Sequence, residues 1–429
     1  MSNELSRRQV LAGATLGVTS GKRSARTRRS KSTKVNAKVP PPSARNLLIV
    51  IDGGPGGRLH ATFGPGTPSI DDGSRGDYFG FNFLIRSLMA KLPKQWTVTR
   101  AHRDVDPHDW ASLSDVDRRS YAPNIERFRF DAIDLATFDA IWLIGVGSVP
   151  ETVSLAETES LAIAQFMEAG GGIFATGDHG DIGQPMCGRI PRVRSMRAWF
   201  TKDPPDNEPR SPDPIAAERN DTTRPGPGED ALSTNFQFSN QSDDNPAPIT
   251  FTADGNGHEL FDLGMGRRLV AFPDHMHEGE VIDPFDPRHH MSPTLTYVGH
   301  AITEYPLAHD GSRPSPVILA LGSVLGGHST ISTETIHVGS SAPTRPGNRL
   351  LGTVCAYDGR PLGLGRVVVT STFHQLADIN LIGDPRALTP SGQPDPLRRV
   401  GFTASPKGRQ LLEDLEVFWA NLARWIARP

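Results

Sequence analysis

The chain has 429 residues, 37% of them hydrophobic, and its 43 glycines and 37 prolines indicate long irregular loops around a buried core. Residues 1–38 hold ten Lys or Arg and one acid, and the remainder, with 35 basic and 47 acidic residues, has a net charge of −12, which argues against a nucleic-acid surface on the folded body. The two cysteines, Cys187 and Cys355, are too few for a disulfide framework, and no apolar run is long enough to predict a membrane span.

The N-terminal tail, residues 1–38, has two interpretations. Residues 6–11 and the small apolar residues after them resemble a twin-arginine export signal, which predicts export of the protein. A dense run of Lys and Arg over residues 22–38 follows at once, and export signals rarely carry so much positive charge there. The alternative is a disordered basic tail on a cytoplasmic protein. Residues 39–46, rich in proline, then form a linker to the folded body, residues 47–429.

The first predicted strand is the apolar run over residues 47–51, which a glycine-rich stretch over residues 53–57 follows. Glycine lets the backbone approach a ligand closely, so Gly53 and Gly54 are candidate substrate-binding residues. The stretch lacks the GxGxxG spacing of a dinucleotide site. A surface loop is the alternative.

Strands and helices alternate along the folded body. Apolar spacing predicts a helix over residues 81–92, and a capping box of Ser154 and Glu157 predicts the start of a second helix that continues to Met167. Apolar runs predict further strands over residues 96–101, 138–145, 173–176, 268–272, 317–321 and 366–370. A final helix has apolar residues at helical spacing: Leu411, Leu415, Phe418, Leu422 and Ile426. Polar stretches near residues 203–248, 283–316 and 384–407 are expected to be inserted loops. The order predicts an α/β domain with a mainly parallel sheet.

Three stretches of this sequence, residues 138–145, the helix leading into 170–179, and residues 365–374, resemble the class I glutamine-amidotransferase-like superfamily. The likeness is closest to its ThuA-like (trehalose utilisation) branch, and together with the first strand these stretches span about half of the chain. It implies a flavodoxin-like three-layer sandwich with long loop insertions.

The sequence departs from that family at its catalytic residues. The position of the family's nucleophilic cysteine falls near Asp178, and the acid expected two residues after the histidine is Leu376. Glutaminase activity is therefore not expected. ThuA-like relatives also lack the cysteine and keep a histidine near the end of the late strand, which His374 matches.

Titratable residues follow two of the predicted strands: Asp178, His179 and Asp181 after one, and His374 after the other. Because the carboxyl ends of parallel strands meet at one edge of a sheet, we expect one site there. His374 is the candidate general acid–base, Asp178 and His179 would orient substrate or water, and Asp181 would contact substrate. The alternative is structural: Asp178 caps a helix, and the histidines are buried and hydrogen-bonded.

Two other polar clusters are candidates for binding. His275, His277 and Glu278 lie within four consecutive positions, and this set could hold a divalent metal such as Zn²⁺, although it has no well-attested ligand spacing. A polar loop over the site is the alternative.

A cluster of four arginines could attract an anionic substrate, but we expect these side chains on the solvated surface. The cluster consists of Arg189, Arg192, Arg194 and Arg197.

The leading functional hypothesis is a hydrolase or lyase that acts on a small polar, sugar-like substrate, with the sugar likeness implied by the resemblance alone. The alternative is a non-catalytic ligand-binding or assembly domain that retains the pocket. A metalloenzyme is a third hypothesis. The sequence does not indicate the substrate or the oligomeric state.

Overall fold

Nine strands from the described part of the chain form one mixed sheet in the computed structural model. Five of them are adjacent and parallel, in the order β2 (Trp96–His102), β1 (Arg45–Asp52), β3 (Ala140–Gly145), β4 (Gly172–Gly177) and β13 (Val367–Thr370). The sheet continues antiparallel through β12 (Arg349–Tyr357), β11 (Val317–Val324), β5 (Ala247–Phe251) and β8 (Ala271–Phe272). The predicted α/β fold is confirmed, and the sheet is parallel in one half and antiparallel in the other.

The structure describes residues 44–52, 81–103, 128–145, 154–177, 183–199, 247–273, 280–286, 293–324, 349–383, 393–394, 396 and 399–429. By their contacts, Ser43–Pro429 form one unit. The basic tail over residues 1–38 and most of the linker over 39–46 lie outside the described residues, as do most of the expected insertion near 203–248 and half of the one near 384–407.

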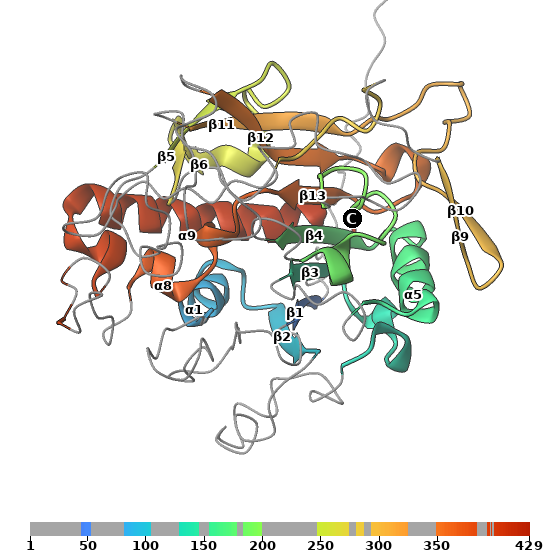
Figure 1. Ribbon diagram of the computed structural model, residues 1–429, viewed down its shortest axis with the longest axis horizontal. Helices are drawn as coiled ribbons and strands as arrows, with labels where there is room; N and C mark the ends of the chain where they lie inside the picture. Colours follow the sequence, from blue (N-terminus) through green and yellow to red (C-terminus); the bar gives the residue numbers. More distant parts are fainter. Residues whose placement is uncertain are drawn as a thin grey trace, which may run out of the picture. The chain divides into compact units, whose positions relative to one another are not determined.

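Helices pack on both faces of the sheet. The helices are α1 (Asn82–Lys91), α5 (Glu157–Glu168), α6 (Gln184–Cys187), α8 (Asp378–Leu381) and α9 (Pro406–Ile426). Alternate residues of β1 show the two faces: Ile49 is buried in a cluster with α1 and α9, whereas Val50 is buried in a cluster with α5 and α6. In Figure 1, α1 lies to the left of the labelled parallel strands, α9 runs from the left of the picture toward β4 and β13, and α5 lies on the right.

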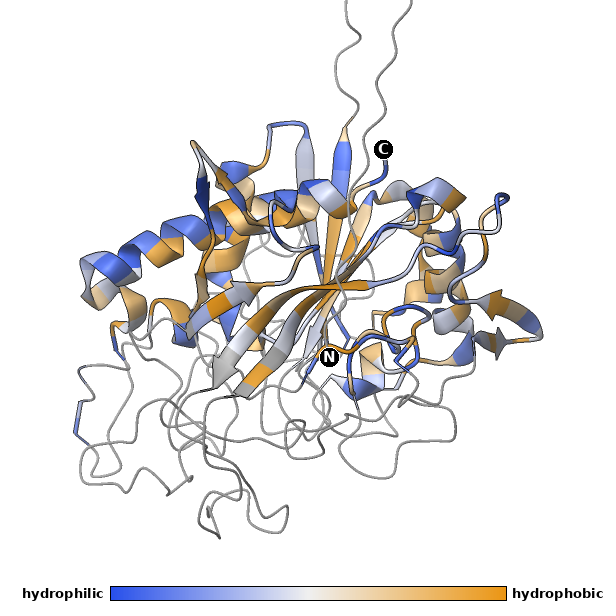
Figure 2. Cartoon of the chain, turned by 90° about the horizontal axis from the view of Figure 1, so that it is seen from above, coloured by the Kyte–Doolittle hydropathy of each residue, from blue (hydrophilic) through white to orange (hydrophobic). Residues whose placement is uncertain are grey.

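The final helix, α9, has the apolar face that its sequence predicts. Its five predicted apolar residues are all buried, and Phe418 stacks on Phe261 with ring centroids 5.8 Å apart. Figure 2 shows the hydrophobic residues of this long helix along one side and the hydrophilic residues along the other. The Ser405 hydroxyl caps its first turn by accepting from the Gly408 N–H at 2.9 Å.

The other end of α9 lies against β4. Gly172 of β4 allows the two backbones to approach closely, because a Cβ at this position would lie 1.8 Å from the Ile426 carbonyl oxygen.

Strand β12 was missed by the apolar pattern, in which Gly352 interrupts the run. That glycine is needed for close packing, since a Cβ at Gly352 would lie 2.3 Å from the Val281 carbonyl oxygen. The strand predicted over residues 268–272 is split between β7 (Arg267–Arg268) and β8. These differences arise from contacts between segments that are far apart in sequence.

Two hairpins stand outside the main sheet. They are β6 (Asp262–Gly264) with β7, and β9 (Thr294–Tyr297) with β10 (His300–Thr303), which lies in the stretch expected as an inserted loop. Short 3₁₀ turns complete the described elements: η2 (Phe130–Ala132), η3 (Leu135–Thr137), η4 (Glu259–Phe261), η5 (Arg360–Leu362), η6 (Phe373–Gln375) and η7 (Gly401–Ala404). Among the helices that the structure describes, none has the length and apolar character to cross a membrane.

Candidate functional site

Four parallel strands end side by side at one edge of the sheet. Asp52 of β1 is in register with Gly145 of β3, which is in register with Gly177 of β4. On the other side of β4, Thr176 is in register with Thr370 of β13. The chain therefore leaves β1, β3, β4 and β13 at the same edge, where ligands of open α/β sheets collect.

Most of the predicted site residues lie outside the described residues: Gly53, Gly54, Asp178, His179, Asp181, His275, His277 and Glu278. The strand ends that immediately precede two of these groups are described. Asp52 comes directly before the glycine-rich stretch, and Gly177 comes directly before Asp178. Both are buried at the edge just described.

His374 lies within the described residues, in the turn η6 that follows β13. Its side chain is only 2% exposed, and the ring of its neighbour Phe373 packs edge-on against Phe81 at 6.1 Å. The histidine is thus held in a packed turn one strand away from the end of β4.

Buried polar side chains surround that turn. The Thr370 hydroxyl donates to the Thr176 hydroxyl at 3.0 Å, and the Gln375 amide donates to Thr370 at 3.4 Å and also to Thr372. The Ser371 hydroxyl donates to the Gly352 carbonyl oxygen at 2.9 Å. These bonds give the turn after β13 a fixed conformation and tie it to both neighbouring strands.

The segment that holds the predicted metal ligands begins and ends at different parts of the sheet. It follows β8, at the edge of the sheet, and it rejoins the described chain at residue 280. There the Val281 N–H donates to the Gly352 carbonyl oxygen at 3.0 Å, the same oxygen that accepts from Ser371. The end of this segment therefore lies beside the turn that carries His374. Within the described residues, no group of three His, Cys, Asp or Glu side chains could hold a metal ion.

Asp378, a carboxylate close to His374 in sequence, has a structural role. Its two oxygens accept from the backbone N–H groups of Asn82 at 3.0 Å and Phe83 at 2.9 Å, so it caps the first turn of α1. Burial raises the pKa of the Asp378 carboxyl, and the two backbone hydrogen bonds oppose that rise. The residue two places after His374, Leu376, is fully buried in the apolar core.

Cys187, at the end of α6, is not poised as a nucleophile. The thiol is fully buried, and burial raises its pKa well above the usual range, with the charge of Asp52 acting in the same direction. A thiolate is the nucleophilic form of cysteine, so this side chain stays protonated and unreactive at neutral pH.

The arginines expected on the surface are buried. Arg192, Arg194 and Arg197 are each 1% exposed, so the expectation of a solvated cluster is wrong for these three. Glu304 explains part of this: it forms an ion pair with Arg194 at 3.0 Å, and its other oxygen accepts from the Arg192 backbone N–H at 2.6 Å. Burial raises the pKa of Glu304, while Arg194 opposes the rise. Nothing local in the sequence marks this partner, because it lies 110 residues beyond Arg194.

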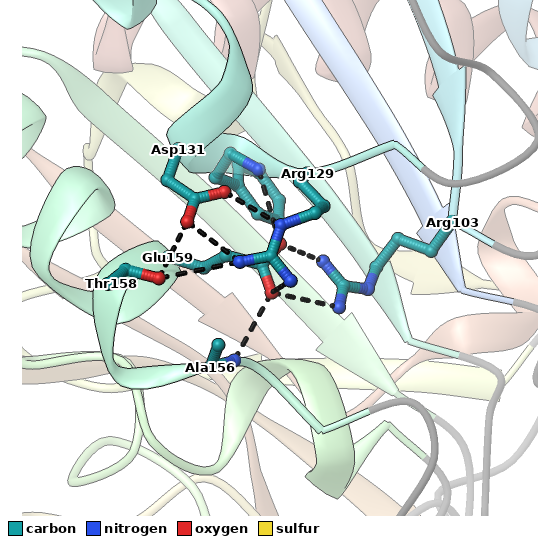
Figure 3. Close-up of polar contacts among 7 residues, drawn as sticks. Arg103, Arg129, Asp131, Ala156, Thr158 and Glu159 are labelled. Atoms are coloured by element: carbon teal, nitrogen blue, oxygen red, sulfur yellow. Dashed lines mark hydrogen bonds and ion pairs between the residues drawn. The ribbon is translucent and has the colours of Figure 1, made fainter.

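A second buried ion pair, drawn in Figure 3, joins Arg103, directly after β2, to Glu159 in the first turn of α5. The fully buried Glu159 carboxylate accepts from Arg103 at 2.6 Å and 3.3 Å, and from the backbone N–H groups of Phe130 and Ala156, both at 3.2 Å. The predicted capping box was thus two residues out of register, since α5 begins at Glu157 and Glu159 is the residue that reaches back.

Comparison with known proteins adds no assignment. No protein-family model matches the chain, and no curated protein matches it.

Proposed function

We propose that the protein is an enzyme of the hydrolase or lyase class that acts on a small polar substrate at the edge where β1, β3, β4 and β13 end. His374 serves as the general acid–base, and Asp178 and His179 orient substrate or water. The observation that carries the proposal is the register of Thr176 with Thr370, because it makes the chain segments that lead to Asp178 and to His374 leave neighbouring strands at one edge.

The meeting of two further segments supports this proposal. Val281 and Ser371 both donate to the Gly352 carbonyl oxygen, so the chain that follows His275, His277 and Glu278 returns to the turn that carries His374. The proposal assigns to these three residues either closure of the site or a divalent ion such as Zn²⁺.

We further propose that the fold is a flavodoxin-like three-layer sandwich of the class I glutamine-amidotransferase-like superfamily, in its ThuA-like branch. The support is the block of five parallel strands with separate buried clusters on its two faces. The buried, protonated Cys187 fits a branch that lacks the cysteine nucleophile. On this proposal the substrate is sugar-like, and the reaction does not pass through a thiol ester.

The experiment is a substrate screen on the full chain with matched variants. Chromogenic glycosides and esters report hydrolysis, and uronic acid substrates report elimination through the absorbance of an unsaturated product. His374→Asn is expected to lower turnover by about a hundredfold or more, the usual contribution of a general acid–base, while the protein stays folded. Asp378→Asn is the control, because it weakens the cap of α1 and should lower Tm without lowering turnover of the folded protein. Full turnover in a folded His374→Asn protein would contradict the proposal.

The metal assignment has its own test. Elemental analysis of the purified full chain is expected to find one divalent ion per chain, and His275→Ala with His277→Ala should remove it. Protein without metal that keeps full turnover would restrict these residues to the closure role.

A non-catalytic ligand-binding domain is the second candidate, and the burial of His374 at 2% exposure favours it. In that case thermal-shift titration with sugars and polyols would show saturable binding, and no substrate in the screen would be turned over.

A further inference from the structure

Arg192 has an uncommon backbone conformation in the segment after α6. Its φ is +68°, in the left-handed region that side chains other than glycine rarely adopt. Two bonds to Glu304 hold it there: the backbone N–H donates to the carboxylate at 2.6 Å, and the side-chain Nε donates to the carbonyl oxygen at 2.7 Å. A buried non-glycine residue in this conformation is a reason to look for function.

The guanidinium of Arg192 is only partly satisfied. Its Nη2 donates to the Thr303 carbonyl oxygen at 3.3 Å, and neither this bond nor the one from Nε reaches a carboxylate. Nη1 is buried and has no hydrogen-bond partner among the residues that the structure describes. The Glu304 carboxylate is directed at Arg194 and at the Arg192 backbone.

A second buried donor without a partner lies near this guanidinium. Tyr357, the last residue of β12, is fully buried, and in the described part of the chain its hydroxyl has no hydrogen-bond partner. Burial raises the pKa of Tyr357, and the charge of Arg192 opposes that rise. Tyr305 links the two residues, because its hydroxyl donates to the Arg192 carbonyl oxygen at 3.3 Å. The ring of Tyr305 packs edge-on against Tyr357 at 5.2 Å.

We propose that Nη1 of Arg192 and the hydroxyl of Tyr357 together bind a small monovalent anion of halide size. Both groups present a hydrogen that needs an acceptor, and burying such groups without one costs free energy. One guanidinium beside Glu304 offers charge for a monovalent ion, whereas a sulfate or phosphate would require more donors. Asp358, the residue directly after β12, is already paired with Arg366 at 3.0 Å and Arg360 at 2.8 Å.

The position of this site predicts what the anion does. Arg192 bonds to Thr303, the last residue of the hairpin strand β10, and to Glu304 directly after it, whereas Tyr357 belongs to the main sheet. An ion between them joins the left-handed turn to the end of β12. Because the ion would bind the folded chain and not the unfolded one, its concentration should set part of the stability.

The test compares bromide with a bulky monovalent anion at equal ionic strength. Tm of the full chain is measured in sodium bromide and in sodium gluconate, and bromide is expected to give a higher Tm that saturates with concentration. Tyr357→Phe removes one donor and keeps the ring, so bromide affinity should fall about tenfold, as one charged hydrogen bond implies. Tyr305→Phe is the matched control, because that hydroxyl already pairs with Ser195 at 2.6 Å; it should lower Tm and keep the bromide dependence.

Anomalous scattering from a crystal grown in bromide supplies a readout independent of stability. A peak within hydrogen-bond reach of Arg192 Nη1 and Tyr357 Oη supports the site, and its loss in Tyr357→Phe supports the role of the hydroxyl. A wild-type crystal without a peak there overturns the proposal. So does an equal response of Tm to bromide and gluconate.

Discussion

The hydroxyl of Thr370 donates to the hydroxyl of Thr176 at 3.0 Å, and the two residues are 194 positions apart in the chain. This bond joins the last pair of residues in register between β4 and β13, just before the two segments that carry the predicted catalytic groups. Neither hydroxyl is exposed to solvent. Removing this bond therefore tests how strongly the ends of β4 and β13 are joined at the candidate site.

Replacing Thr370 by valine tests this relationship. Thr370→Val keeps the shape of the side chain and leaves the buried Thr176 hydroxyl without its donor, so it should destabilise the protein by about 1–3 kcal/mol in urea unfolding. Adding Thr176→Val should cost less than the sum of the two single changes, because both partners are then apolar. Additive costs in the double variant would show that the two hydroxyls do not interact.

The buried carboxylate of Glu159 should matter far more than the exposed one beside it. Glu159→Gln leaves Arg103, which is 8% exposed, with a weaker partner in a buried site, and the expected loss is about 3–5 kcal/mol. Asp131→Asn is the control, because its partner Arg129 is 47% exposed and such pairs contribute at most about 1 kcal/mol. Chemical denaturation of both variants measures the contrast, and equal losses would contradict it.

Asp378 and Asp131 should affect the pH dependence of stability with opposite signs. Burial raises the pKa of Asp378 in the folded protein above its ordinary value of 3.8, so folding favours the protonated carboxyl. The stability of the protein therefore falls as the pH rises from 3.8 through the pKa of the folded state. The folded pKa of Asp131 is lowered, mainly by Arg129, so its contribution is present above 3.8 and is lost as the pH falls through the folded pKa.

Each aspartate is compared with its asparagine variant in urea titrations from pH 3 to pH 7. The wild type should lose stability relative to Asp378→Asn as the pH rises above 3.8, whereas it should gain stability relative to Asp131→Asn as the pH rises toward 3.8 and change little above that value. Curves with the same slope for both variants would refute the assignment.

Gly172 should not tolerate a methyl group. A Cβ at this position would lie 1.8 Å from the Ile426 carbonyl oxygen, so Gly172→Ala must displace the end of α9 from β4. We expect a loss of about 3 kcal/mol, near the upper end for overpacking. Gly299→Ala is the control: it meets no atom within 4 Å and only strains a φ of +80°, for about 1–2 kcal/mol. Thermal unfolding compares the two, and a milder effect at Gly172 would count against this packing.

The spacing of apolar residues predicted those strands and helices whose pattern of burial is set by residues close in sequence. The apolar runs of β1 and β3 and the apolar face of α9 were recognisable, because a strand or helix that buries one or two faces must repeat its apolar residues at the matching spacing. Strand β12 was missed because Gly352, which interrupts its apolar run, is required by contact with Val281 rather than by the strand itself. The reading of Ser154 as a cap failed by two residues, since the carboxylate that reaches back is Glu159.

The sequence by itself determined the α/β class of the protein and the strands that lead to Asp178 and His374. Only the tertiary structure decided that these strands are neighbours, that Asp378 caps α1, and that Arg192 is buried with Glu304. The physical reason is the range of the interactions. Local backbone preference and apolar spacing act over a few residues, whereas burial of a charge depends on a partner more than a hundred positions away, which no local pattern encodes.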